Sequence, residues 1–374
     1  MKILHAGNTA NVGYQTTKQL RKNGIESELL LESSGMNNLT NIDPDLKNEY
    51  PNWVFFFNKK KHFWKMKIIT TMRDKKYDLI HTYGELPIFA YFSGKPFVVQ
   101  ALGSDFREKA ISNSLIGLLL RRAYKKAKII LFSMPDHIPI YQKLGLKNGI
   151  FLPLIVNSNF FKPLNLERTE YTDELVVLHA TNLEWRLKRN DILIKGFAEF
   201  VKTNPQSLLI IIDRGVDSEK TKQLVNSLGL AKKVKYIKGP LNSTEMRHYY
   251  NTADIVADAF NFPAISGTTN ESLCCEKPVI AYYPTKEFEE VYPEQPPILN
   301  ASTDSEVKQQ LEMLVDVKKR IEIGKKGRDW ILKYNNPDLY SNKLKIIYQS
   351  VLNGDKIEQI RENLRQVTPL KKIN

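Results

Sequence analysis

Cysteine is scarce in this sequence: only two of the 374 residues are cysteines, the adjacent Cys274 and Cys275. Because neighbouring cysteines rarely bridge one another, we expect no disulfide framework and a reducing compartment. No run of about 18 uncharged apolar residues is present, which excludes a predicted membrane-spanning helix. The first residues run directly into a strand pattern without signal-peptide architecture, which favours a cytoplasmic location. Low-complexity tracts and sequence repeats are also lacking.

The composition is that of a folded globular protein. Hydrophobic residues make up 42% of the chain and charged residues 26%. These proportions exclude a disordered or collagen-like chain. At roughly 100–200 residues per domain, the length predicts two domains or three. The six histidines show no metal-ligand spacing, and we find no Ser-His-Asp arrangement.

The formal net charge of +14 is concentrated in the N-terminal half. Residues 1–160 hold 23 basic and 12 acidic side chains, whereas the remainder holds 32 and 29. Two clusters, at residues 53–67 and 118–128, mix Lys and Arg with bulky apolar residues. That mixture suits an anionic membrane surface, or else a pair of amphipathic surface helices with solvated charges. Nucleic acid is not expected, because no nucleic-acid-binding motif accompanies the charge. The cations that we expect at a membrane surface are Lys59, Lys60, Lys61, Arg121, Arg122 and Lys125.

The N-terminal half begins with a strand, a glycine-containing turn, a helix and a second strand. The strand is expected at residues 2–6, the turn at 7–13, the helix at 14–23 and the next strand at 28–31. Such a βαβ unit builds a parallel sheet with a right-handed crossover. Further strands are expected at 79–81, 97–100 and 129–132.

The same alternation starts again after a segment rich in Pro and Asn. Strands are expected at 175–179, 208–212, 234–237, 254–257 and 278–281, with helices at 191–202, 218–228, 244–251 and 270–275. The sequence therefore predicts an α/β protein with two Rossmann-like doubly wound domains facing across a cleft. We expect these domains at 1–155 and 173–340, joined by a linker at 156–172. A helical tail at 341–374 is expected to pack back on the N-terminal domain.

A small-residue turn in the second half precedes an expected helix. It reads Ser266-Gly267-Thr268-Thr269, and backbone N–H groups at such a helix start attract phosphate oxygens. Glu271 follows in the first turn, where its carboxylate suits a ribose diol. In the alternative interpretation, Glu271 contacts no ligand and its charge only stabilises the N-terminus of its own helix.

The segment from Glu271 to Ile280 resembles the donor-site signature of the GT-B glycosyltransferases. The match is to the large family 4 of retaining enzymes, the glycosyl transferases group 1, whose motif ends in Gly-Lys-Pro-Val-Ile. Here the segment reads Glu-Ser-Leu-Cys-Cys-Glu-Lys-Pro-Val-Ile, with Glu276 in place of the usual Gly. The resemblance runs from Met1 to about Tyr340.

The resemblance implies an enzyme of the hexosyltransferase class. It would move a sugar from a nucleotide-sugar to an acceptor hydroxyl with retention, and would need no metal or other cofactor. Arg186 and Lys188 would stabilise the leaving diphosphate, although Arg189 replaces the Gly usual after the Lys. Glu271 would hold the ribose. The other donor contacts implied are Ser266, Gly267, Thr268, Thr269, Gly13, Pro240 and Leu241.

One departure from the family pattern concerns the transferred sugar. The family carries a first Glu eight residues before the second, and here that position is Pro263. Asp258, at a strand end five residues earlier, is a candidate substitute. His81 and Asp105 also stand at expected strand ends and are candidate sugar or acceptor contacts.

The basic N-terminal half fits a lipid-linked or surface saccharide as acceptor. The protein would then act in polysaccharide biosynthesis, in the cytoplasm or as a peripheral protein on the inner face of the cell membrane. Two alternatives stay open. One is a nucleotide-sugar-binding protein without transferase activity, and the other is a GT-B enzyme such as a sugar-nucleotide 2-epimerase.

Overall fold

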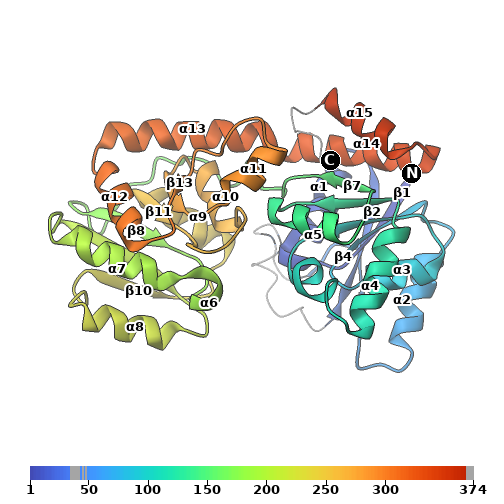
Figure 1. Cartoon of the computed structure of the whole chain (residues 1–374), viewed down its shortest axis with the longest axis horizontal. Helices are drawn as coiled ribbons and strands as arrows, with labels where there is room; N and C mark the ends of the chain where they lie inside the picture. The colour runs from blue at the N-terminus through green and yellow to red at the C-terminus, as the bar shows by residue number, and fades with distance from the viewer. Residues whose placement is uncertain (34–42, 44–45, 47–48, 368–374) are drawn as a thin grey trace. The chain divides into compact units, whose positions relative to one another are not determined.

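The computed structural model describes residues 1–33, 43, 46 and 49–367, which form two compact units (Figure 1). Unit 1 combines Met1–Ile155, Lys286–Glu294 and the chain from Tyr334 onward. Unit 2 combines Val156–Thr285 and Gln295–Lys333. Each unit holds a parallel sheet with helices, so the predicted α/β class with two Rossmann-like domains is confirmed. None of the helices in the described ranges is long and apolar enough to cross a membrane.

Unit 1 is built on a seven-stranded parallel sheet in the order β3-β2-β1-β4-β5-β6-β7. Its strands are β1 (Lys2–Ala6), β2 (Glu26–Glu32), β3 (Val54–Phe57), β4 (Leu79–Tyr83), β5 (Phe97–Ala101), β6 (Ile129–Phe132) and β7 (Gly149–Phe151). The central strands are buried because a parallel sheet is covered on both faces, and they include buried polar side chains such as His81 and Gln100. The strand order reverses between β1 and β4, and a crevice forms at the carboxyl edge of such a sheet.

Helices cover the sheet of unit 1. They are α1 (Val12–Lys22), α2 (Trp64–Arg73), α3 (Pro87–Ser93), α4 (Leu115–Lys126), α5 (Ile138–Lys143), α14 (Pro337–Asn353) and α15 (Ile357–Arg365), with α11 (Thr285–Val291) at a unit boundary. The short turns are η1 (Thr9–Asn11), η4 (Asp105–Lys109) and η5 (Pro135–His137). Ser114 caps the start of α4: its hydroxyl accepts the Gly117 N–H and so satisfies an otherwise unpaired donor of the first turn.

The C-terminal helix α14 packs on the sheet of unit 1, where Figure 1 draws it in red beside the blue and green strands. The Tyr348 hydroxyl lies 2.6 Å from Nδ1 of His81 on β4. The Tyr340 hydroxyl donates to Oε1 of Gln100 on β5 at 3.1 Å. Leu344 is fully buried in the same apolar cluster as the sheet residues. Because these contacts begin near the start of α14, the tail joins unit 1 a few residues before the expected residue 341.

Unit 2 holds a six-stranded parallel sheet in the order β10-β9-β8-β11-β12-β13. Its strands are β8 (Leu175–His179), β9 (Ser207–Asp213), β10 (Val234–Lys238), β11 (Ile255–Ala257), β12 (Val279–Ala281) and β13 (Leu299–Asn300). Its helices are α6 (Trp185–Lys188), α7 (Asn190–Val201), α8 (Ser218–Ser227), α9 (Ser243–Thr252), α10 (Gly267–Cys274), α12 (Asp304–Met313) and most of α13 (Val317–Asn335). The residues expected as a linker, 156–172, fall in this unit.

The aromatic run before Lys59 is a strand, which corrects the interpretation of this cluster as a surface helix. Val54–Phe57 forms β3 and pairs with β2 in parallel, with Leu31 opposite Phe56. Val54 and Phe57 are buried, so these two side chains pack at the edge of the core and do not face solvent. Their consecutive bulky residues favour a strand. β3 and the short strands β7 and β13 were not predicted from the sequence.

Candidate active site

The first turn of α10 is fastened to the end of β11 by a buried carboxylate. Asp258 is 1% exposed and accepts hydrogen bonds from the hydroxyls of Ser266 and Thr269, the latter at 2.6 Å. Ser266 caps the helix by accepting the Thr269 N–H. Gly267 is exposed, and a Cβ there would meet nothing within 4 Å. The turn therefore leaves an open approach to the positive end of the α10 dipole.

Lys188 is held beside this turn by the backbone. Its carbonyl accepts the Phe260 N–H at 2.8 Å, which ties the end of α6 to the loop after β11. Its ammonium lies 3.3 Å from the centroid of the Phe262 ring, a cation–π contact. Arg189, which replaces the family Gly, adopts a left-handed φ of 49° and pairs with Asp191. Lys188 thus supplies a positive charge at the carboxyl edge of the sheet.

Arg186 lies differently. Its side chain is 76% exposed, and its nearest carboxylate is Glu184 at 3.8 Å. The structure therefore brings Lys188, but not Arg186, into close contact with the loop that leads to α10.

Glu271 lies half-buried on α10, one turn beyond the exposed Gly267. Its Oε2 accepts a hydrogen bond from the Tyr250 hydroxyl at 2.9 Å. Burial raises the pKa of Glu271 to about 7, although the Tyr250 hydrogen bond and the charge of Arg214 act in the opposite direction. The two oxygens of a carboxylate offer about four lone pairs, so the hydrogen bond from Tyr250 leaves room for a diol.

Arg214 is the residue that the sequence analysis missed. It follows β9 directly, and its Nη2 donates to the Ala180 carbonyl at 3.1 Å. Its Nε is buried without a hydrogen-bond partner among the described residues. A Cβ on Gly239 would lie 3.4 Å from the Arg214 side chain, so the Gly239–Pro240 turn runs beside the guanidinium. The signal in the sequence was a lone Arg at the end of the apolar run of β9.

Pro240 and Leu241 line that same edge. Pro240 is exposed and follows a cis peptide bond, and Leu241 is half-buried. Both lie in the loop between β10 and α9, and the family resemblance implies both as donor contacts.

The three candidates in unit 1 are placed differently from expectation. His81 is fully buried, and burial lowers its pKa well below the usual value. Asp105 is 5% exposed and accepts the Gly103 N–H at 2.9 Å, and its burial raises its pKa to about 6. Both side chains are buried inside unit 1, and their roles as sugar or acceptor contacts stay predictions. Gly13 is also buried: a Cβ there would lie 2.1 Å from the Gly7 carbonyl, so close packing of the first turn requires this glycine.

Metal binding has no evident site in the described parts of the chain, where no group of three or more His, Cys, Asp or Glu side chains could hold an ion. The Cys274–Cys275 pair is buried, and burial raises the pKa of both thiols.

Residues 165–330, which include every unit 2 side chain described above, match the family model of the glycosyl transferases group 1. The protein is a glycosyltransferase. No curated protein matches the chain.

Solved structures share the fold of this glycosyltransferase over nearly its whole length. Anabaena Alr3699/HepE, solved in complex with UDP-glucose, is 15% identical and has a TM-score of 0.74, covering 94% of this chain and 100% of its own. Sucrose-phosphate synthase from Thermosynechococcus elongatus is 15% identical, with a TM-score of 0.72 and coverage of 95% and 100%. A putative UDP-N-acetylglucosamine 2-epimerase from Listeria monocytogenes is 11% identical, with a TM-score of 0.64 and coverage of 96% and 98%. At these low sequence identities, the structural similarity shows only that the GT-B fold is shared.

Proposed function

We propose that this glycosyltransferase moves a sugar from a nucleoside-diphosphate sugar to an acceptor hydroxyl, with retention of configuration. The observation that carries the proposal is the gathering of cations and a helix N-terminus at one edge of the unit 2 sheet. Lys188, Arg214 and the turn Ser266–Thr269 follow β8, β9 and β11 respectively. Anabaena Alr3699/HepE, which shares the fold, was solved in complex with UDP and with UDP-glucose, which supports a diphosphate ligand here.

The proposed roles follow from where negative charge develops during the reaction. The leaving nucleoside diphosphate gains negative charge as the bond to the sugar breaks, and preorganised cations stabilise it. Lys188 and Arg214 supply these cations, while N–H groups at the start of α10 bind phosphate oxygens. Glu271 accepts hydrogen bonds from the ribose diol, and Pro240 and Leu241 contact the base. Arg186 as a further cation stays a prediction, which its alanine variant tests.

Sugar recognition is where this chain departs most from the family pattern. Pro263 carries no side-chain donor or acceptor at the position of the family's first Glu. Asp258 already accepts two hydroxyl hydrogen bonds, and its Oδ1 is buried without a partner among the described residues. We propose that Asp258 acts on the sugar indirectly, by positioning the α10 turn.

The proposal predicts that Lys188→Ala lowers donor turnover by about 100-fold, because one stabilising charge on the leaving group is lost. Turnover is measured as nucleoside diphosphate released from a panel of uridine, guanosine and adenosine diphosphate sugars, together with analysis of the sugar product. Lys202→Ala is the matched control, since Lys202 is an exposed lysine that pairs with Glu199. Wild-type turnover by the Lys188 variant would contradict the assigned role.

The same experiment separates the alternative functions. A nucleotide-sugar-binding protein, which the loss of the first Glu at Pro263 favours, would bind donor and release no diphosphate. A 2-epimerase would return a sugar of altered configuration. Transfer to an acceptor with the anomeric configuration retained is the result that we expect.

We also propose that the acceptor is a lipid-linked or surface saccharide, used in polysaccharide biosynthesis at the cytoplasmic face of an anionic membrane. Lys60, Lys61, Arg122 and Lys125 are exposed and available to such a surface. Lys59 instead pairs with Glu32, and Arg121 donates to two backbone carbonyls. Flotation with anionic lipid vesicles should capture the protein, and equal capture by neutral vesicles would contradict an electrostatic contribution.

A further inference from the structure

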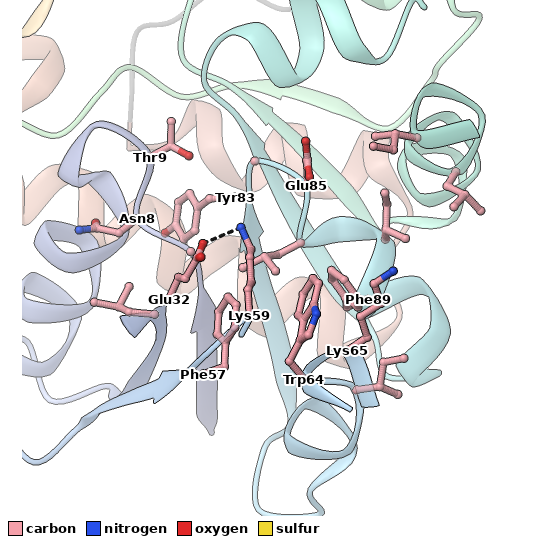
Figure 2. Close-up of a pocket in the computed structure, with 18 of the residues that line it drawn as sticks. Asn8, Thr9, Glu32, Phe57, Lys59, Trp64, Lys65, Tyr83, Glu85 and Phe89 are labelled. Carbon is pink, nitrogen blue, oxygen red and sulfur yellow. Dashed lines mark ion pairs between the residues drawn. The ribbon is translucent and has the colours of Figure 1, made fainter. Parts of the chain in front are cut away.

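Unit 1 contains a cavity of about 1060 Å³ at the carboxyl edge of its sheet (Figure 2). The residues that follow β1 and β4 form its floor, where the strand order reverses. The helices α2, α3 and α4 form its other walls. Ligands of open α/β sheets bind in such a crevice, and nothing in the roles assigned above uses it.

One end of the cavity is polar. Asn8 and Thr9 lie there after β1, with Glu32 at the end of β2 (Figure 2). Glu32 forms an ion pair with Lys59 at 2.6 Å. Amide, hydroxyl and carboxylate groups close together are the partners that sugar hydroxyls require.

The other end is apolar and aromatic. The ring of Trp64 on α2 lies 5.7 Å from that of Phe89 on α3, between ring centroids, and 6.2 Å from that of Phe57. Ile69 and Leu119 continue this wall. An apolar molecule in this part of the cavity would displace water from hydrocarbon surface.

The apolar wall continues onto the outside of unit 1. Of the 17 large hydrophobic side chains that are exposed in the described chain, eight lie between residues 63 and 118. They are Phe63, Met66, Tyr91, Phe92, Ile111, Leu115, Ile116 and Leu118. Leu115 and Ile116 both line the mouth of the cavity, and they are 71% and 44% exposed. Exposed apolar surface of this density marks a binding region.

A cation stands beside the apolar part. Lys65 lines the cavity, and its ammonium lies 5.6 Å from the centroid of the Trp64 ring. The two other lysines of the lining, Lys59 and Lys109, pair with Glu32 and Glu85. Among the described residues Lys65 makes no ion pair, so its charge is available to an anionic group of a ligand.

We propose that this cavity binds the acceptor, and that the acceptor is a saccharide joined through phosphate to a long apolar chain. The sugar occupies the polar end at Asn8, Thr9 and Glu32. The phosphate faces Lys65, and the chain runs past Trp64 toward Leu115 and Ile116. This inference rests on the proposed function, because it names the acceptor of that reaction. A soluble saccharide would leave the aromatic wall and the exposed patch without a role.

Trp64 makes the cavity directly observable. Titration with dodecyl phosphate, below its critical micelle concentration, should change tryptophan emission saturably in the wild-type protein. The change should disappear in Trp64→Phe. Lys65→Glu and Ile116→Glu should each weaken binding at least tenfold, the first by charge repulsion and the second by placing a charge against the chain. Dodecyl maltoside, which lacks the phosphate, should bind more weakly, and inorganic phosphate should give no response.

Matched controls lie in unit 2. Val216→Glu alters an apolar side chain that is 87% exposed, and Lys232→Glu reverses an exposed charge. Both should bind dodecyl phosphate as the wild type does. Unchanged affinity in both cavity variants, or a response to inorganic phosphate alone, would overturn the inference.

Donor turnover in the same proteins keeps the two proposals distinguishable. Lys232→Glu should release nucleoside diphosphate by hydrolysis at the wild-type rate, because Lys232 has no role in either proposed site. Turnover without any binding of dodecyl phosphate would overturn this inference alone. Binding of dodecyl phosphate without turnover in any protein would contradict the proposed function.

Discussion

Glu271 carries the proton equilibrium most relevant to donor binding. Its pKa is raised to about 7, mainly by burial, so the folded protein holds this proton more tightly than the unfolded chain does. The stability that this proton supplies is complete below the unfolded pKa of about 4.5. It is lost as the pH rises toward 7, and above that the contribution of Glu271 is constant.

Glu271→Gln should therefore remove a fall in stability with pH. We expect the free energy of unfolding of the wild type, relative to this variant, to decrease from pH 4.5 to 7 and then to level off. Urea unfolding at a series of pH values measures the difference. A difference that rises with pH over this window would contradict the raised pKa.

Single residues also show how much of this site could be predicted from the sequence. The turn Ser266–Thr269 and Glu271 were predictable, because a strand, a small-residue turn and a helix lie in one short segment. Lys188 was expected from the resemblance to the family. Arg214 was not, since its proximity to Glu271 depends on the pairing of β9 with β8. The burial of His81 was not predictable either, because a strand-end position does not reveal a helix packed over it.

At the scale of elements, α14 is essential to the core of unit 1. Its tyrosines hydrogen-bond to β4 and β5, and its apolar face joins the cluster of the sheet. The helical period of this segment was readable from the sequence. Its contact with particular strands was not, because these contacts join residues more than 200 positions apart.

Tyr348→Phe tests this packing at a single atom. It removes the hydroxyl that pairs with Nδ1 of His81, leaving a buried polar group without that partner. We expect a loss of about 1–3 kcal/mol in the free energy of unfolding. Chemical denaturation measures it, with Tyr91→Phe, an exposed tyrosine of α3, as the control. Equal stability of the two variants would mean that this hydrogen bond contributes nothing.

The strands show why sequence patterns predict some strands correctly and misassign others. Buried strands such as Ser207–Asp213 are continuous apolar runs, and their positions were predicted within a residue or two. β3 was misread because its aromatic run precedes three lysines, and the cluster as a whole resembles an amphipathic surface segment. Only pairing with β2 decides between the two interpretations.

At the scale of the whole molecule, the two units divide the chemistry. Unit 2 carries the cations and the helix N-terminus proposed for the diphosphate, and unit 1 carries most of the positive charge and the amphipathic cavity. The repeated alternation of strands and helices made the two-domain α/β fold predictable. The cavity was not predictable, since its lining comes from segments spread over residues 7–119.

The central claim is that unit 2 binds a nucleoside diphosphate through Lys188, Arg214 and the start of α10. Calorimetric titration with UDP and with uridine tests it most directly. We predict that UDP binds at least tenfold more tightly than uridine, and that Lys188→Ala and Arg214→Ala each remove most of this difference, whereas Lys202→Ala does not. Equal affinity for UDP and uridine, or an undiminished preference in both variants, would contradict the claim.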